Sequence, residues 1–194
     1  MHPNSRLRRA ALRSYTLIEL IMVMAVLALA AALLIPHMVG TDSMTVQAAV
    51  RLLIADLSFA QSDALANQEF RRVVFYDEGE GYCILIVDSF DAATPADLDD
   101  PSVNYVYDPL GMMGRYIVDY SVDDRFEGVA ITEATIDGTI LSLQPQITYD
   151  QLGGTVRLDS TPGIGGSIVL TFKDSSYRIT VSPFTGKLTV NAEP

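Results

Sequence analysis

Residues 14–36 have the sequence SYTLIELIMVMAVLALAAALLIP, which is the most informative segment of the chain. After Glu19 it contains no charged residue, and its apolar sequence is unbroken from Leu20 to Ile35. The 21 residues from Tyr15 to Ile35 would span about 30 Å as a helix, which matches the hydrocarbon core of a bilayer. Four arginines and no acidic residue precede the stretch, at positions 6, 8, 9 and 13. The sequence therefore predicts one membrane-spanning helix with a basic amino-terminal end.

Glu19 separates three interpretations of this segment. A secretory signal peptide ends in a small-residue cleavage site, which Ala28-Leu29-Ala30 could imitate. Its apolar run would then begin with an ionised carboxylate, which costs about 2.5–3.5 kcal/mol near the centre of a membrane helix and less near its end. An ordinary membrane anchor fits the length but gives Glu19 no role. The third interpretation is a leader that is cleaved before Tyr15, so that a new amino terminus becomes the partner of the glutamate.

Residues 14–20 resemble the processing motif of type IV pilins and type II secretion pseudopilins, which is usually written G-F-T-L-I-E. The residues that match this motif directly are Thr16, Leu17, Ile18 and Glu19. Ser14 stands in place of the glycine, and Tyr15 stands in place of the phenylalanine. The resemblance implies that a prepilin peptidase cuts between Ser14 and Tyr15 and methylates the new amino group of Tyr15. It also implies that Glu19 pairs with the amino group of a neighbouring subunit and sets the register of assembly.

Pro36 supports the same resemblance, because it falls at mature position 22, where many pilins and pseudopilins carry a helix-bending proline. A proline removes one helix hydrogen bond, so a helix kink is expected there. The implied organisation is a leader peptide over residues 1–14, a transmembrane helix and assembly segment over 15–39, and an amphipathic helix over 40–67. The amphipathic helix would continue the transmembrane helix into the globular domain.

Residues 40–67 have the apolar spacing of one amphipathic helix. Its apolar stripe, with intervals of three or four residues, consists of Val46, Val50, Leu53, Leu57 and Ala60. The residues predicted on the opposite, polar face are Arg51, Asp56, Gln61 and Asp63. One face of this helix is therefore expected to pack in a core and the other to meet solvent.

Residues 68–194 are predicted to form a β-rich domain, because the apolar period shortens to two and turn residues punctuate it. The strands expected are 72–76, 82–87, 168–172 and 177–181, and a last strand through Leu188 and Val190. Residues 89–114 are expected to form a long loop, with a short strand at 105–107. The fold class is therefore α+β, with a long amino-terminal helix packed on an antiparallel β-sheet region or a small β-sandwich.

The carboxyl-terminal part resembles the H-type minor pseudopilins and related minor pilins. The features that carry this resemblance are a strand meander ending in Ser182–Lys187 and two aromatic-Asp-x-x-Gly stretches, Tyr149–Gly153 and Tyr107–Gly111. It implies a minor pseudopilin of type II secretion, anchored once in the inner membrane, with a periplasmic domain until it enters a pseudopilus. The implied partners are prepilin peptidase, other pilin or pseudopilin subunits and the inner-membrane assembly platform. A minor type IV pilin is the alternative, and a DNA-uptake pilin is a more distant one.

The charge balance disfavours nucleic acid as a partner. Removal of residues 1–14 takes away four of the 13 basic residues and none of the 24 acidic ones, so the net formal charge changes from −11 to −15. Nucleic-acid affinity depends mainly on Lys and Arg side chains that neutralise phosphates. Arg71 and Arg72 form the only adjacent basic pair after residue 14, and they are expected to flank a strand. No nucleic-acid partner is therefore expected.

Residues suited to catalysis or metal binding are scarce. Histidine occurs only at His2, in the leader, and at His37, at the expected membrane edge, so the domain lacks the usual general base. Cys83 is the only cysteine and is expected to be a small buried hydrophobe. The aspartates at 88–100 lack the spacing of an EF-hand and are expected to form a solvated acidic loop. The chain is therefore expected to be no enzyme and to carry no cofactor or metal.

Overall fold

The computed structural model describes residues 16–39, 41–87 and 103–193, and within 32–42 it describes the backbone alone. The chain divides into two compact units, Met1–Gly40 and Thr41–Pro194, called here the amino-terminal unit and the body. The predicted continuation of one long helix across residue 40 lies partly outside the described residues, so it stays a prediction.

The helix α1 forms the amino-terminal unit and extends from Leu17 to Val39. Thr16 caps it, because the Leu20 N–H donates to the Thr16 carbonyl oxygen at 3.2 Å and the Glu19 N–H donates to Thr16 Oγ1 at 3.3 Å. A threonine followed three residues later by glutamate is typical of a helix start, where N–H groups lack partners within the helix. Every described side chain of α1 is exposed and, apart from Glu19, apolar.

The body combines α2, which extends from Thr41 to Asn67, with two five-stranded antiparallel sheets. The first sheet has the order β3-β2-β1-β6-β7, and the second has the order β10-β9-β8-β4-β5. The strands of the first sheet are β1 Phe70–Phe75, β2 Gly81–Val87, β3 Ile117–Asp119, β6 Gln146–Tyr149 and β7 Thr155–Val156. The strands of the second sheet are β4 Ala130–Ile136, β5 Thr139–Ile140, β8 Gly166–Phe172, β9 Ser175–Val181 and β10 Leu188–Glu193. The short 3₁₀ helices are Met112–Gly114 and Leu141–Leu143.

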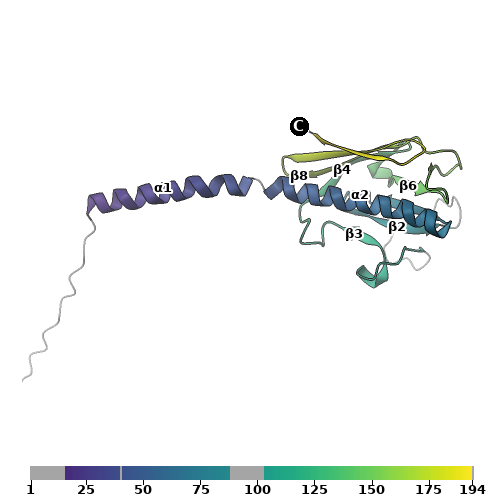
Figure 1. The fold of residues 1–194 in the computed structure, drawn as a ribbon, viewed down its shortest axis with the longest axis horizontal. Coiled ribbons are helices and arrows are strands. Elements are labelled where there is room, and N and C mark those ends of the chain that lie inside the picture. The colour runs from purple at the N-terminus through teal and green to yellow at the C-terminus, as the bar shows by residue number, and fades with distance from the viewer. Residues whose placement is uncertain (1–15, 40, 88–102, 194) are drawn as a thin grey trace, which may run out of the picture. The chain divides into compact units, whose positions relative to one another are not determined.

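The helix α2 packs against strands of both sheets and joins them in one core (Figure 1). The buried stripe contains every residue predicted for it, namely Val46, Val50, Leu53, Leu57 and Ala60. The same core includes Val73 and Phe75 from β1, Ile168 and Leu170 from β8, and Ile179 from β9. Full burial of a large aliphatic or aromatic side chain contributes about 1.5–3 kcal/mol, so this interface is the main source of the body's stability.

The α+β prediction is confirmed at the level of two helices and antiparallel sheets. The predicted first hairpin is present as β1 and β2, with Val74 opposite Cys83 in an unbroken register. The predicted second hairpin is present as β8 and β9, and β10 follows as the last strand. Runs of strand-forming residues bounded by turn residues therefore located these strands.

The five strands between β2 and β8 were not located by the sequence pattern. The longest of them, β4, changes register between Ile131 and Glu133. This irregularity leaves Thr132 and Glu133 both exposed, which breaks the alternation of apolar and polar residues. The strands β3, β5 and β7 have only three, two and two residues, which is too short for a period to be visible.

The expectation that Arg71 and Arg72 flank a strand is wrong. Both residues lie within β1 and are 3% and 0% exposed. The Arg71 guanidinium pairs with Asp63 of α2 and with Glu69. Arg72 Nε donates to Thr148 Oγ1 at 3.1 Å. Arg71 therefore joins α2 to the first sheet and Arg72 bonds within that sheet, so neither is a surface group.

Candidate functional site

The first candidate site is the start of α1. The residues predicted there that the structure describes are Thr16, Leu17, Ile18 and Glu19, which form the helix cap and the first turn. Ser14 and Tyr15 lie outside the described residues. Pro36 lies within α1, in the part where only the backbone is described, so the kink stays a prediction.

Glu19 is the one charged side chain in the described part of α1. The helix dipole places partial positive charge at this end, where acidic side chains are common. Among the described residues, the Glu19 side chain has no hydrogen-bond or ion-pair partner, and only its N–H bonds to Thr16. Its carboxylate is therefore available to a cationic group from another molecule or from the chain's own amino terminus.

The two helices differ in their relation to a possible membrane. By length and composition, Ser43–Asn67 is the one stretch of the described chain that is long and apolar enough to cross a membrane. Its apolar side chains fill the core of the body, as those of a core helix in any compact domain do. Leu17–Ala31 is also apolar but is shorter, and the side chains that would complete the predicted span of 15–39 are outside the described set.

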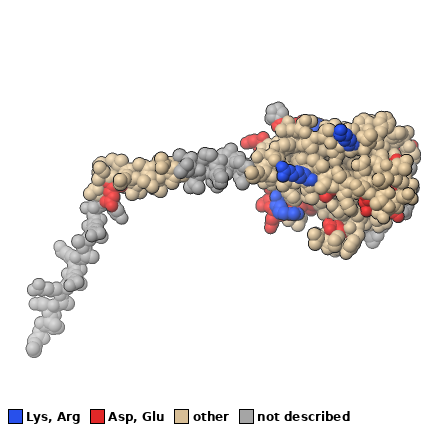
Figure 2. Space-filling view, viewed as in Figure 1, with Lys and Arg blue, Asp and Glu red and all other residues tan. Residues whose placement is uncertain are grey.

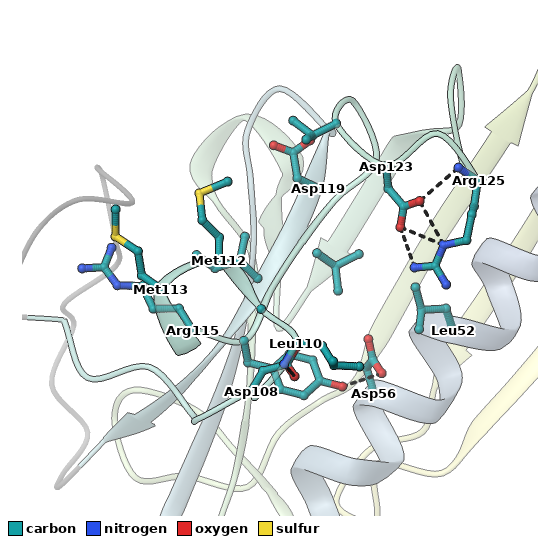
Figure 3. Close-up of a pocket in the computed structure, with 15 residues that line it drawn as sticks. Leu52, Asp56, Asp108, Leu110, Met112, Met113, Arg115, Asp119, Asp123 and Arg125 are labelled. Atoms are coloured by element: carbon teal, nitrogen blue, oxygen red, sulfur yellow. Dashed lines mark hydrogen bonds and ion pairs between the residues drawn. The ribbon is translucent and has the colours of Figure 1, made fainter.

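The second candidate site is a groove of about 490 Å³ beside α2, which we call the Asp56 groove (Figure 3). Its α2 wall includes Leu52 and Asp56, and its opposite wall comes from segments between residues 108 and 125, including the 3₁₀ helix Met112–Gly114 and β3. The charged residues that line it are Asp56, Asp108, Asp119, Asp123, Arg115 and Arg125. The groove thus combines apolar walls with several carboxylates.

Asp56 is a buried carboxylate in this groove, with 4% of its surface exposed. Each of its oxygens accepts one phenol hydroxyl, from Tyr82 at 2.5 Å and from Tyr116 at 2.8 Å. Burial raises the pKa of the Asp56 carboxyl, the two hydroxyl donors oppose that rise, and Asp108 adds to it. No cationic side chain is among the groups that shift this pKa.

The prediction that Asp56 faces solvent is therefore wrong. Residues three and four apart share one face of a helix, and Asp56 follows Leu53 by three residues and precedes Ala60 by four. The spacing of Asp56 along α2 therefore places it on the buried face, although an acidic residue is usually found on the polar face. In the structure the spacing determines the face on which Asp56 lies. The spacing was the feature of the sequence that could have located it. The two hydroxyl donors offset part of the cost of removing the carboxylate from water.

The tyrosines that hold Asp56 belong to an aromatic cluster. Tyr116 stacks on Phe59 of α2 with ring centroids 5.3 Å apart, and Tyr82 meets Tyr120 edge-on with centroids 6.2 Å apart. Burial raises the pKa of Tyr82, of Tyr116 and of Tyr120, so these phenols remain protonated near neutral pH. The cluster therefore holds the buried Asp56 carboxyl group in place with two neutral hydroxyl donors.

The outer wall of the groove is the loop 107–115, whose first and last residues form a β-bridge. The Leu110 N–H donates to Asp108 Oδ1 at 2.9 Å, which closes the turn at the tip. The tip is apolar and open to solvent, because Leu110, Met112 and Met113 are 95%, 67% and 76% exposed. The sequence pattern predicts a loop for these residues but does not indicate that they border a groove.

The turn Tyr149–Gly153 repeats the bond that closes the 107–111 turn. Asp150 Oδ1 accepts the Leu152 N–H at 2.9 Å, and the leucine that follows the aspartate by two residues is exposed in both turns. The second turn does not line the Asp56 groove. The chain therefore contains two turns of matching sequence and geometry, of which one borders the groove.

The remaining residues considered in the sequence have simple outcomes. Cys83 is buried, as predicted, and burial raises the pKa of its thiol to about 12. His2 and the acidic residues at 88–100 lie outside the described residues, and His37 is described by its backbone alone. Within the described side chains, no group of three or more metal-binding residues occurs.

No protein family model, curated protein or solved structure matches this chain. A function must therefore follow from two features, the lone glutamate in the first turn of α1 and the Asp56 groove of the body.

Proposed function

We propose that this chain is a prepilin-like membrane precursor that a prepilin peptidase cuts between Ser14 and Tyr15, and that becomes a minor pseudopilin of type II secretion. In this proposal α1 and α2 are the two halves of one long helix, bent at Pro36. The first half lies in the inner membrane, and the second half packs in a periplasmic body. The mature chain begins with a methylated Tyr15, joins other subunits on the inner-membrane platform, and serves as a structural subunit rather than an enzyme.

Glu19 carries the proposal. It is the single carboxylate of an apolar helix whose described side chains are all exposed, and an unpaired carboxylate in lipid is costly enough to require a partner. Cleavage before Tyr15 would create a cation at the amino terminus of each subunit. The amino group of one subunit and Glu19 of its neighbour can then compensate each other.

The same residues support a minor type IV pilin, which differs in the filament it enters rather than in its leader. The genes beside this one distinguish the two systems, because each filament is encoded with its own assembly proteins. A DNA-uptake pilin is less favoured. On the face shown in Figure 2, the Lys and Arg side chains of the body are scattered rather than arranged as a stripe, and the adjacent pair Arg71 and Arg72 is buried.

Mass spectrometry of membrane-extracted protein tests the proposal, with and without a co-expressed prepilin peptidase. The expected product starts at Tyr15, carries one added methyl group, and forms only when the peptidase is present. Ser14→Gly, which restores the usual residue of the family, should be cleaved at least as well, whereas the bulky Ser14→Leu should remain uncut. A chain that starts at Ala31, after Ala28-Leu29-Ala30, would overturn the proposal in favour of a secretory signal.

A further inference from the structure

Apolar side chains stand exposed around the Asp56 groove. Besides Leu110, Met112 and Met113 of the tip, Val122 of the groove lining is exposed. Exposed apolar patches of this kind on a folded surface commonly mark contact sites. Methionine suits such a site, because its unbranched, polarisable side chain adapts to varied apolar partners.

The tip is held in place by its own backbone. The Asp108 N–H donates to the Gly114 carbonyl oxygen at 3.0 Å, and the Gly114 N–H donates to the Gly111 carbonyl oxygen at 3.1 Å. Met113 adopts a left-handed backbone with φ 56°, which costs a residue with a Cβ about 1–2 kcal/mol. These hydrogen bonds hold the two exposed methionines in a fixed loop.

The charges of the groove are unevenly compensated. Arg125 is engaged by both carboxylate oxygens of Asp123, at distances between 2.6 and 3.1 Å. Arg115 lies over the Tyr105 ring at 5.1 Å from its centroid. Asp56, by contrast, is held by neutral hydroxyl donors, and within the described chain no ion pair reaches Asp56 or Asp108. The uncompensated charge of the groove is therefore negative.

We propose that the Asp56 groove is the docking site for a segment of another protein in which a lysine or arginine is flanked by apolar residues. The cationic group enters the groove toward Asp56 and Asp108, and its aliphatic stem lies along the apolar walls. The flanking residues cover Leu110, Met112 and Met113. A polypeptide fits better than a small amine, because the exposed rim extends well beyond the carboxylates. This inference does not depend on α1, on cleavage or on a filament.

The environment of Asp56 supports a cationic partner. Burial raises the pKa of its carboxyl, and only hydroxyl donors oppose that rise. A cation bound nearby favours the ionised form of a carboxyl group, so docking would supply the charge that the groove lacks. A purely apolar partner would instead leave two carboxylates covered and uncompensated, which is costly.

Methyl NMR of the full chain in nanodiscs of zwitterionic lipid tests the proposal, with ¹³C-labelled methionine. The probe is a blocked peptide with one lysine flanked by leucines, and its control carries norleucine in place of the lysine. The methyl signals of Met112 and Met113 are expected to shift saturably with the lysine peptide. The norleucine peptide should bind about tenfold more weakly or worse, because it lacks the charge. Met44, which is outside the groove, should not respond.

Asp108→Asn is the main variant, because an amide oxygen can still accept the Leu110 N–H while the charge is removed. It should weaken the lysine peptide several-fold and leave the norleucine peptide unchanged. Asp150→Asn is its matched control, since it makes the same change in the turn that does not border the groove, and it should have no effect. Asp56→Asn should act like Asp108→Asn, and if that buried variant does not fold, the Asp108 and Asp150 pair still decides the question.

Three outcomes would overturn the proposal. Equal affinity for the two peptides would show an apolar surface without charge selection. Equal weakening by Asp108→Asn and Asp150→Asn would show that the groove is not the site. Shifts of Met112 and Met113 that follow protein concentration without peptide would show that the face binds a second copy of this chain.

Discussion

The helices α1 and α2 each carry one carboxylate on an apolar surface, yet the two carboxylates have opposite surroundings. Asp56 is buried in the body, and Tyr82 and Tyr116 of its own chain donate to it. Glu19 is exposed at the first turn of α1, and no described side chain bonds to its carboxylate. A carboxylate that is removed from water needs a partner, and Glu19 would be removed from water in the membrane helix that we propose. Asp56 finds its partners within the fold, so the comparison predicts that the partner of Glu19 comes from outside it.

This difference separates folding from assembly. Loss of the Asp56 carboxylate should disturb the body, because two hydroxyl groups would lose their acceptor. Loss of the Glu19 carboxylate should leave the body unchanged and disturb only the contact that we propose between Glu19 and another subunit. Variants at the two positions therefore test the comparison directly.

The largest effect is expected for Glu19→Ala, on the assembly of filaments. The variant should be cleaved, inserted and folded, because removal of a charge from an apolar helix does not hinder insertion. In a filament the amino group of the neighbouring subunit would lose its counter-charge, and an unpaired buried charge costs about 3–5 kcal/mol. Immunoblots of sheared filaments should therefore show strongly reduced incorporation.

Glu19→Gln is the matched control, because it keeps the size of the side chain and removes its charge. It should be defective to nearly the same extent as Glu19→Ala. Normal incorporation of both variants would show that Glu19 needs no partner from another subunit.

The second largest effect is expected for Asp56→Ala, on the stability of the body. Tyr82 is fully buried, and a buried donor left without an acceptor costs about 1–3 kcal/mol. With two hydroxyl groups affected, the free energy of unfolding should fall by about 2–4 kcal/mol. Urea unfolding of the full chain in zwitterionic detergent, followed by near-ultraviolet circular dichroism of the tyrosines, measures the change. Asp56→Asn retains an acceptor oxygen and should lose less than half as much.

The sequence located elements that repeat regularly and missed features that arise from the joining of distant segments. The apolar stripe of α2 follows a period near 3.6, the first hairpin consists of two apolar runs around a turn, and the second hairpin alternates with a period of two. All of them are present in the structure. The strand β4 was missed because its register irregularity interrupts the period. The Asp56 groove was missed because its walls come from α2 and from a loop about fifty residues later, and no local pattern connects the two.

A smaller effect is expected when pH changes the charge of Asp56. Its pKa is raised in the folded state, mainly by burial, so the protonated form is the one that folding favours. That stabilising contribution is complete below the pKa of the unfolded chain and is lost as pH rises through the higher pKa of the folded state. Relative to Asp56→Asn, the unsubstituted chain should therefore gain stability between about pH 7 and pH 4, by about 1.4 kcal/mol for each pKa unit.

Paired urea titrations of the two chains isolate this term, because every other carboxyl group is common to both. Asp123 and Asp159 have pKa values lowered by hydrogen bonds from Arg125 and Thr161, so both carboxylates lose stabilising interactions in acid. Their contribution cancels in the difference between the two chains. A difference that does not change with pH would show that Asp56 is not the titrating group.

The smallest effect is expected for Arg178→Met, on the outer side of the second sheet. Arg178 of β9 pairs with Glu193 of β10 and with Glu133 of β4, and its Nη1 donates to Ser167 Oγ at 2.9 Å. Its side chain is 31% exposed, so water and salt compete for these contacts. The free energy of unfolding should therefore fall only slightly, and by less than in Asp56→Ala.

Salt dependence distinguishes this network from the buried carboxylate. At about 1 M salt the Debye length is about 3 Å, so the effect of Arg178→Met should largely disappear, whereas the effect of Asp56→Ala should persist. Asp56 is buried and bonded to neutral hydroxyl groups, which salt does not screen. Arg178 lies at the surface and is held by opposite charges, which salt does screen. If the two variants respond to salt alike, burial does not set the strength of these contacts. The contrast between exposed Glu19 and buried Asp56 would then need a different cause.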